Sequence, residues 1–302
     1  MGRDLAENFP ESRGVFDEAD AALGFAISKL CFEGSEDDLK LTENTQPAIL
    51  TVSMAAYRAM EKRGITPDFV GGHSLGEYSG LVAAGALDFG TAVKLVHNRG
   101  KYMQEAVPHG EGAMAAIMGL SPSDVAEICK KAADHDVVSP ANLNSPEQTV
   151  ISGKAAAVKR AVEIASQSGA KRAVILPVSA PFHCALMEPA QKRLEPELRA
   201  AAFSALRVPL ITNVDAEAIT SGEEARDALI RQVTMPVRWL DSMHELLESG
   251  ATIFVEVGPG KVLSGLLRQI DRSVRCFNVE DSASLKSTLE KIALARAETQ
   301  ES

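Results

Sequence analysis

Apolar residues recur at helical spacing along most of the chain's N-terminal third. Residues 12–24 carry this pattern and stop at Gly24, which predicts a helix with its end at a glycine. Residues 45–64 carry it again, with Pro47 expected in the first helical turn and Gly64 after the last. The following segments predict one short strand and two helices, at 67–72, 75–87 and 89–107.

The pattern changes between residues 111 and 180. Short apolar runs predict four strands there, and two amphipathic segments between them predict helices, the first with Ser121 as its N-cap. The strands are expected at 113–120, 137–143, 148–153 and 171–179, and the helices at 121–135 and 154–169. The order β-α-β-β-α-β is that of a small ferredoxin-like unit.

Helices and apolar strands alternate again after this unit. Strands are expected at 208–214, 251–258 and 273–279. Such alternation predicts a parallel sheet covered by helices. The predicted fold is therefore α/β: an α/β-hydrolase-like large domain with a parallel sheet, formed by residues 1–110 and 181–302 and interrupted by a small ferredoxin-like α+β subdomain at 111–180.

Composition narrows the range of partners. With 45% apolar residues among 302, the chain can bury a full core, and its 41 acidic and 31 basic residues give a formal charge of −10. Nucleic acid or an anionic membrane surface is therefore not expected as a partner. The four cysteines are scattered and form no C-x-x-C pair, so we expect reduced thiols in a cytoplasmic protein.

The segment Gly72-His73-Ser74-Leu75-Gly76 satisfies G-x-S-x-G between a predicted strand and a predicted helix. In this motif the sharp turn lifts the serine hydroxyl clear of the sheet and directs backbone N–H groups at a forming oxyanion. Side chains that flank the serine are expected to be small. The alternative is a glycine-rich strand-to-helix turn with an idle serine.

A serine nucleophile needs a base, and the chain has six histidines. His73 adjoins Ser74 on a turn where neighbouring side chains diverge, and most of the others lie in polar helical or loop stretches. His183 instead follows the predicted strand 171–179, at the carboxyl end where open α/β sheets place working groups. We predict His183 as the base, although its position alone also allows a structural role. No carboxylate near it in sequence could orient the ring.

Arg99 is the one charge on an apolar helical face that also carries Ala92, Val96 and Met103. A buried arginine cannot lose its proton and must find an anion. It could therefore form an internal salt bridge, extend to water, or grip a substrate carboxylate through two parallel hydrogen bonds. The run EVGPGKVLSG lacks the spacing of a phosphate-binding loop, and no residue cluster has the spacing of a metal site.

Five blocks of the sequence together resemble the malonyl-CoA:acyl carrier protein transacylases, acyltransferases of fatty-acid and polyketide synthesis. They are GGHSLGEYSGLVAAG, VHNRGKYMQEAVPHGEGAMAAIMGL, VSPANLNSPEQTVISG, PVSAPFHCALMEPA and VEVGPGKVLSGLL. The blocks stand in the family's order, and the resemblance extends from the N-terminus to about residue 280. The family also has an inserted ferredoxin-like unit.

The resemblance implies roles for the matching residues. Ser74 would be the acylated nucleophile, His183 its base, and Arg99 the clamp for the free carboxylate of malonate. Leu75 would supply one oxyanion N–H, and the main-chain carbonyl of Gln232 would orient the histidine, where the alternative is an ordinary glutamine at a helix end. Three further positions would line the substrate pocket: Gln46, Asn144 and Phe182, the last resembling the malonyl-preferring members.

The resemblance also implies the reaction. Malonyl would pass from coenzyme A to Ser74 and then to the phosphopantetheine thiol of an acyl carrier protein, in a ping-pong scheme of fatty-acid biosynthesis. Neither a metal nor a redox cofactor would be needed, and a monomer away from membranes is expected. Two rival functions are a serine hydrolase or thioesterase and a non-catalytic carrier-binding relative.

The start of the chain departs from the family pattern. Members begin with a strand that leads into a GQGSQ loop shortly before a Met-Gly pair like Met1-Gly2. That loop supplies a second oxyanion donor, whose loss costs a factor of about 10²–10³. We expect Met1 to be an internal methionine of a longer protein. The alternative is that the chain as given is a relative with impaired activity or low stability.

Overall fold

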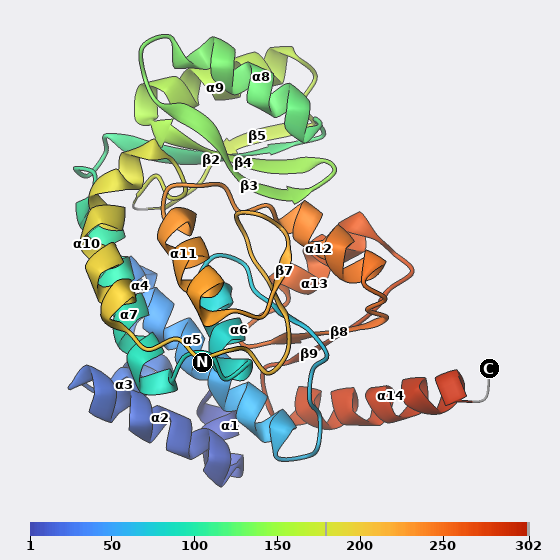
Figure 1. Ribbon diagram of the computed structural model, residues 1–302. Helices are drawn as coiled ribbons and strands as arrows, with labels where there is room; N and C mark the ends of the chain where they lie inside the picture. Colours follow the sequence, from blue (N-terminus) through green and yellow to red (C-terminus); the bar gives the residue numbers. More distant parts are fainter. Residues whose placement is uncertain (179, 301–302) are drawn as a thin grey trace.

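The computed structural model describes residues 1–178 and 180–300 and shows a mixed α/β protein (Figure 1). Five helices come first: α1 (Arg3–Asn8), α2 (Pro10–Leu23), α3 (Ile27–Glu33), α4 (Glu36–Lys40) and α5 (Thr42–Glu61). The end of α2 at Gly24 is as predicted, with this glycine in the left-handed conformation. The expected start of α5 is wrong, because the helix begins at Thr42 and holds Pro47 in its interior.

Short parallel pairs stand where a longer parallel sheet was expected. β1 (Val70–Gly71) pairs in parallel with β6 (Leu210–Ile211), and β6 pairs with an antiparallel strand that the sequence pattern did not indicate, β7 (Ala218–Ile219). β8 (Ile253–Val257) and β9 (Arg275–Val279) form a separate parallel pair. Helices around these strands are α6 (Gly76–Ala83), α7 (Phe89–Glu105), α10 (Glu188–Ala200), α11 (Gly222–Gln232), α12 (Trp239–Glu248), α13 (Val262–Ile270) and α14 (Ser282–Gln300).

A second layered unit lies at the top of the molecule in Figure 1, drawn in green. Its elements follow the predicted order: β2 (Gly112–Met118), α8 (Pro122–Ala133), β3 (Val138–Ser145), β4 (Gln148–Lys154), α9 (Ala155–Gln167) and β5 (Arg172–Ile175). The strands form one antiparallel sheet in the order β3-β4-β2-β5, and Ser121 caps α8 as expected. β5 is shorter than the predicted strand, whose last residue, 179, lies outside the described residues.

The two faces of this sheet pack against different parts of the protein. Helices α8 and α9 cover one face, where Ile117 and Ile151 pack against Val125 and Val158. The opposite face presents a second apolar cluster of Met114, Ala116, Ala141 and Val150, and Phe182 packs against it. Phe182 also packs against the main core, so it stands between the small sheet and the rest of the protein.

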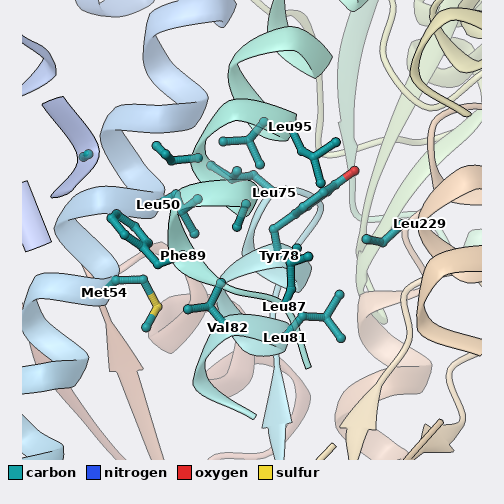
Figure 2. Close-up of a cluster of buried hydrophobic side chains, with 14 of the residues drawn as sticks. Leu50, Met54, Leu75, Tyr78, Leu81, Val82, Leu87, Phe89, Leu95 and Leu229 are labelled. Atoms are coloured by element: carbon teal, nitrogen blue, oxygen red, sulfur yellow. The ribbon is translucent and has the colours of Figure 1, made fainter. Parts of the chain in front are cut away.

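The main core surrounds α6, the helix that follows the serine motif (Figure 2). Side chains of α6 meet α5 on one side and α11 on the other. Burying a large apolar side chain contributes about 1.5–3 kcal/mol, so this cluster anchors the turn before α6 firmly. The residues drawn there include Leu50, Met54, Leu75, Tyr78, Leu81, Val82, Leu87, Phe89, Leu95 and Leu229. Of the helices described, none has the length and apolar content to cross a bilayer.

Close packing of α7 on the start of α5 depends on Gly100. A Cβ there would lie 2.5 Å from the Thr42 carbonyl oxygen and 2.7 Å from the Glu43 Cα, which are backbone atoms. We expect Gly100→Ala to lower the free energy of unfolding by about 1–3 kcal/mol.

Gly14 provides the matched control, because it lies inside α2 and a Cβ there would meet nothing within 4 Å. Gly14→Ala should instead raise the free energy of unfolding by about 0.5–1 kcal/mol, since alanine suits a helix interior better. Urea denaturation followed by circular dichroism measures both. Equal effects of the two substitutions would refute the close-packing argument.

Candidate active site

Ser74 sits on a strained turn between β1 and α6. Its φ is +53°, in the left-handed region that non-glycine residues adopt uncommonly. A Cβ at Gly72 would lie 2.0 Å from the Gly76 carbonyl carbon, whereas a Cβ at Gly76 would meet nothing within 4 Å. Of the two flanking glycines, only Gly72 is therefore required by the turn.

Asn213 holds this turn from the neighbouring strand. It follows β6, which pairs with β1, and its buried side-chain amide spans the turn. Its Oδ1 accepts a hydrogen bond from the Ser74 N–H at 2.7 Å, and its Nδ2 donates to the Gly72 carbonyl at 2.7 Å. The sequence reading missed Asn213, although a polar residue at the carboxyl end of a strand is a usable signal.

The structure brings Ser74 and His183 together across 109 residues of sequence: Ser74 Oγ lies 2.7 Å from His183 Nε2. The imidazole Nδ1 lies 2.8 Å from the main-chain carbonyl of Gln232 and donates to it, which leaves Nε2 as the acceptor for the hydroxyl proton. His183 has a φ of +56° and is 3% exposed. The ring is thus oriented by a carbonyl rather than a carboxylate.

Burial favours the neutral ring, and the nearby Arg99 guanidinium acts in the same direction. Together they lower the pKa of His183 to about 3. A base must be unprotonated to accept a proton, so His183 is in the competent form at neutral pH.

Arg99 lies on the buried face predicted for it, with 2% of its surface exposed. Nη1 donates to Gln46 Oε1 at 2.6 Å, and Nη2 donates at 3.0 Å to both Ser74 Oγ and Gln232 Oε1. Within residues 1–178 and 180–300, no carboxylate lies within ion-pair distance of the guanidinium. Neither an internal salt bridge nor an extension to water accounts for this cation, which contacts the nucleophile itself.

The remaining predicted residues lie at different distances from this centre. Gln232 is fully buried, and Gln46 touches Arg99 directly. Asn144 Oδ1 accepts from His73 Nε2 at 2.9 Å, so it contacts the residue before the serine and not Ser74 or His183. Among the described residues, the Leu75 N–H has no protein acceptor.

Glu77 is a further buried residue that the sequence reading did not single out. Its carboxylate has no exposed surface, and Oε2 accepts from the Asn213 N–H at 3.0 Å and from Gln232 Nε2 at 2.9 Å. Burial raises the pKa of Glu77 to about 7. An acidic residue in the first turn of a helix is ordinary on a surface, so the sequence carried no sign that this one is enclosed.

Comparisons with known proteins agree with this geometry. The acyl transferase domain family matches residues 1–292. The malonyl CoA-acyl carrier protein transacylases of Bacillus subtilis and Escherichia coli are 46% and 47% identical, over 97% and 96% of this chain and 92% and 94% of theirs. The chain therefore belongs to the acyl transferase family.

Solved structures of relatives share the fold closely. The malonyl CoA-acyl carrier protein transacylase of Coxiella burnetii is 43% identical with a TM-score of 0.94, covering 96% of this chain and 92% of that one. A second structure, described as a type II PKS acyl-carrier protein in complex with its malonyl-transacylase, is 44% identical with a TM-score of 0.94, covering 96% and 94%.

The low pKa of His183 generates a prediction for the reactivity of Ser74. A neutral sulfonyl fluoride should modify Ser74 at a rate that changes by less than about threefold between pH 7.5 and pH 5. A histidine with an ordinary pKa near 6.5 would instead slow the reaction by about thirtyfold at pH 5, because most of the base would be protonated. Mass spectrometry of timed samples gives the rate, and His183→Ala is the control that should abolish it. A sigmoidal fall centred near pH 6.5 would contradict the prediction.

Proposed function

We propose that this protein transfers a malonyl group from coenzyme A to the phosphopantetheine thiol of an acyl carrier protein through a malonyl-serine intermediate. One observation carries the proposal: the guanidinium of Arg99, which has no carboxylate within ion-pair distance among residues 1–178 and 180–300, donates to the hydroxyl of a serine that also contacts a neutral histidine. A cation placed beside a nucleophile suits an acyl group with a free carboxylate at its far end.

In the first half-reaction the malonyl carboxylate binds Arg99 and replaces Ser74 Oγ as the acceptor of Nη2. His183 Nε2 then takes the hydroxyl proton while Ser74 Oγ attacks the thioester carbonyl. The Leu75 N–H, which has no acceptor among the described residues, supplies one donor to the oxyanion. Collapse of the tetrahedral intermediate breaks the C–S bond, and the imidazolium returns its proton to the leaving thiolate as coenzyme A departs.

In the second half-reaction the carrier's phosphopantetheine thiol gives its proton to His183 and attacks the malonyl-serine carbonyl. The C–O bond breaks, and Ser74 recovers its proton from the imidazolium, so the enzyme is unchanged after each cycle. These steps require proton transfer and charge stabilisation alone. We therefore propose that no metal or redox cofactor takes part.

The finer description of the fold belongs to the same proposal. The strand order β3-β4-β2-β5 with α8 and α9 on one face supports a ferredoxin-like subdomain at about residues 111–180. The turn before α6 and the parallel pairs support an α/β-hydrolase-like large domain around it. The four free cysteines support action in the cytoplasm, where thiols stay reduced. The net charge of −10 supports a monomer, because like charges keep copies of the protein apart.

The names of the relatives favour this function over its rivals. Proteins 46–47% identical over nearly the whole chain are malonyl CoA-acyl carrier protein transacylases, and one similar structure holds an acyl-carrier protein. A hydrolase would use water in place of the carrier thiol, and a non-catalytic relative would have no use for the strained Ser74 turn beside His183.

Mass spectrometry after mixing the protein with malonyl-CoA tests the proposal. We expect an added mass of about 86 Da on Ser74, the malonyl group of the covalent intermediate, and its loss when holo carrier protein is added. Ser74→Ala should remain unmodified. Free malonate appearing equally fast with and without carrier would favour a hydrolase, and carrier binding without an adduct would favour a non-catalytic relative.

The carboxylate clamp makes a separate prediction about selectivity. Removing one partner of a buried charge pair costs about 2–5 kcal/mol, so Arg99→Ala should lower kcat/KM for malonyl-CoA by about 10²–10³-fold. The kcat/KM for acetyl-CoA, whose acyl group has no free carboxylate, should fall far less or increase. Lys94→Ala removes a cation from the exposed side of the same helix and should leave both rates unchanged. An unaltered malonyl-to-acetyl ratio in Arg99→Ala would refute the clamp.

A further inference from the structure

A buried chain of hydrogen bonds connects Arg99 to Glu77. The Arg99 guanidinium donates to Gln232 Oε1 at 3.0 Å, and the other end of the same amide, Nε2, donates to Glu77 Oε2 at 2.9 Å. The amide dipole is therefore aligned between a cation and an anion, with its oxygen on the positive side. All three side chains are at least 98% buried, so water screens this charge pair very little.

Few other charges act on Glu77. Arg99 lies on α7, and Tyr78, the residue after Glu77 on α6, is neutral because burial raises its pKa. Asp215 and Arg231 lie on the β6–β7 turn and on α11, but they neutralise one another through two hydrogen bonds of 2.7 Å and 2.6 Å. Within the described parts of the chain, Arg99 is thus the cation that offsets Glu77.

A substrate with a free carboxylate disturbs this balance, because it places a second anion beside the same cation. Two carboxylates that share one buried cation cannot both stay ionised without a large electrostatic cost. We propose that Glu77 takes up one proton from solvent when the malonyl carboxylate binds Arg99, so that the occupied site stays electrically neutral. This inference rests on the proposed function, and it makes Glu77 a positioning residue that acts through Gln232.

The hydrogen bonds of Glu77 show which oxygen can accept the proton. Oε2 already accepts two N–H groups, whereas Oε1 is buried without a hydrogen-bond partner among the described residues. Protonation of Oε1 therefore breaks no existing hydrogen bond and leaves Gln232 in place. Burial already raises the pKa of Glu77 to about 7, so a nearby second anion needs to shift it only modestly.

The chemistry of acylation makes this proton measurable. Ser74 and the thioester become an ester and a free thiol, with no net gain or loss of protons at pH 7. A proton that is taken up from solvent as the adduct forms must therefore be accepted by a group of the acylated protein. His183 is the other candidate, because its low pKa is partly caused by the charge of Arg99, which malonate would offset.

A pH indicator in weakly buffered solution measures the uptake. The full-length protein is mixed with malonyl-CoA at pH 7, and malonyl-serine is counted by mass spectrometry in the same sample. We expect about half a proton per adduct, since a group with a pKa near 7 is already half protonated. Glu77→Gln, which keeps an acceptor oxygen, should form the adduct with no uptake, and Glu223→Gln, an exposed acid on α11, should behave like the unaltered protein.

The possible results distinguish a failure of the proton-uptake proposal from a failure of the proposed malonyl transfer. An adduct without proton uptake, or uptake that persists in Glu77→Gln, would overturn the role of Glu77 and leave malonyl transfer standing. Absence of any adduct would remove the proposed function and this inference with it.

A second measurement needs no variant. If binding takes up a proton, KM for malonyl-CoA should rise with pH above 7, by up to about tenfold per pH unit, while KM for acetyl-CoA stays level. A KM for malonyl-CoA that is constant between pH 6.5 and pH 8.5 would overturn the proposal even if Glu77→Gln fails to fold.

Discussion

The active site depends on the buried side chain and carbonyl of Gln232, the last residue of α11. Its main-chain oxygen orients His183, and its amide group contacts Arg99 and Glu77 and donates to the Ser74 carbonyl at 2.9 Å. Four groups from three separate parts of the chain thus take their positions from one residue. A buried polar network of this kind is stable only when its members are satisfied together, so the site forms as a unit with the core around α6.

Two of the four non-glycine residues that have a positive φ among the described residues are the two reacting residues. Ser74 and His183 both have positive φ angles, which cost of order 1–3 kcal/mol each unless the surroundings impose them. Asn213 imposes the first through two hydrogen bonds to the turn, and the apolar packing of α6 holds the helix that follows. The second is imposed by the Gln232 carbonyl together with the buried setting of the ring.

Sequence reasoning found the elements whose signals are local. The serine turn, the helix end at Gly24, the cap at Ser121 and the buried face of α7 are each encoded within a few residues. It failed where geometry depends on distant neighbours. The apolar pattern did not show that the strands around β1 would be short. Proline usually stands in the first turn of a helix, but Pro47 lies in the interior of α5. Glu77 and Asn213 look like ordinary polar residues until the fold encloses them.

The small sheet is tied to the same segment that carries Gln232. The Leu143 N–H of β3 donates to the Val237 carbonyl at 2.9 Å, and the Val237 N–H donates to the Ala141 carbonyl at 2.8 Å. If the small unit rotated about a hinge, both hydrogen bonds would break, and the segment that follows α11 would be displaced. These two hydrogen bonds therefore oppose a hinge motion of the small unit relative to the segment that follows α11, because such a motion would leave polar groups of β3 without their partners.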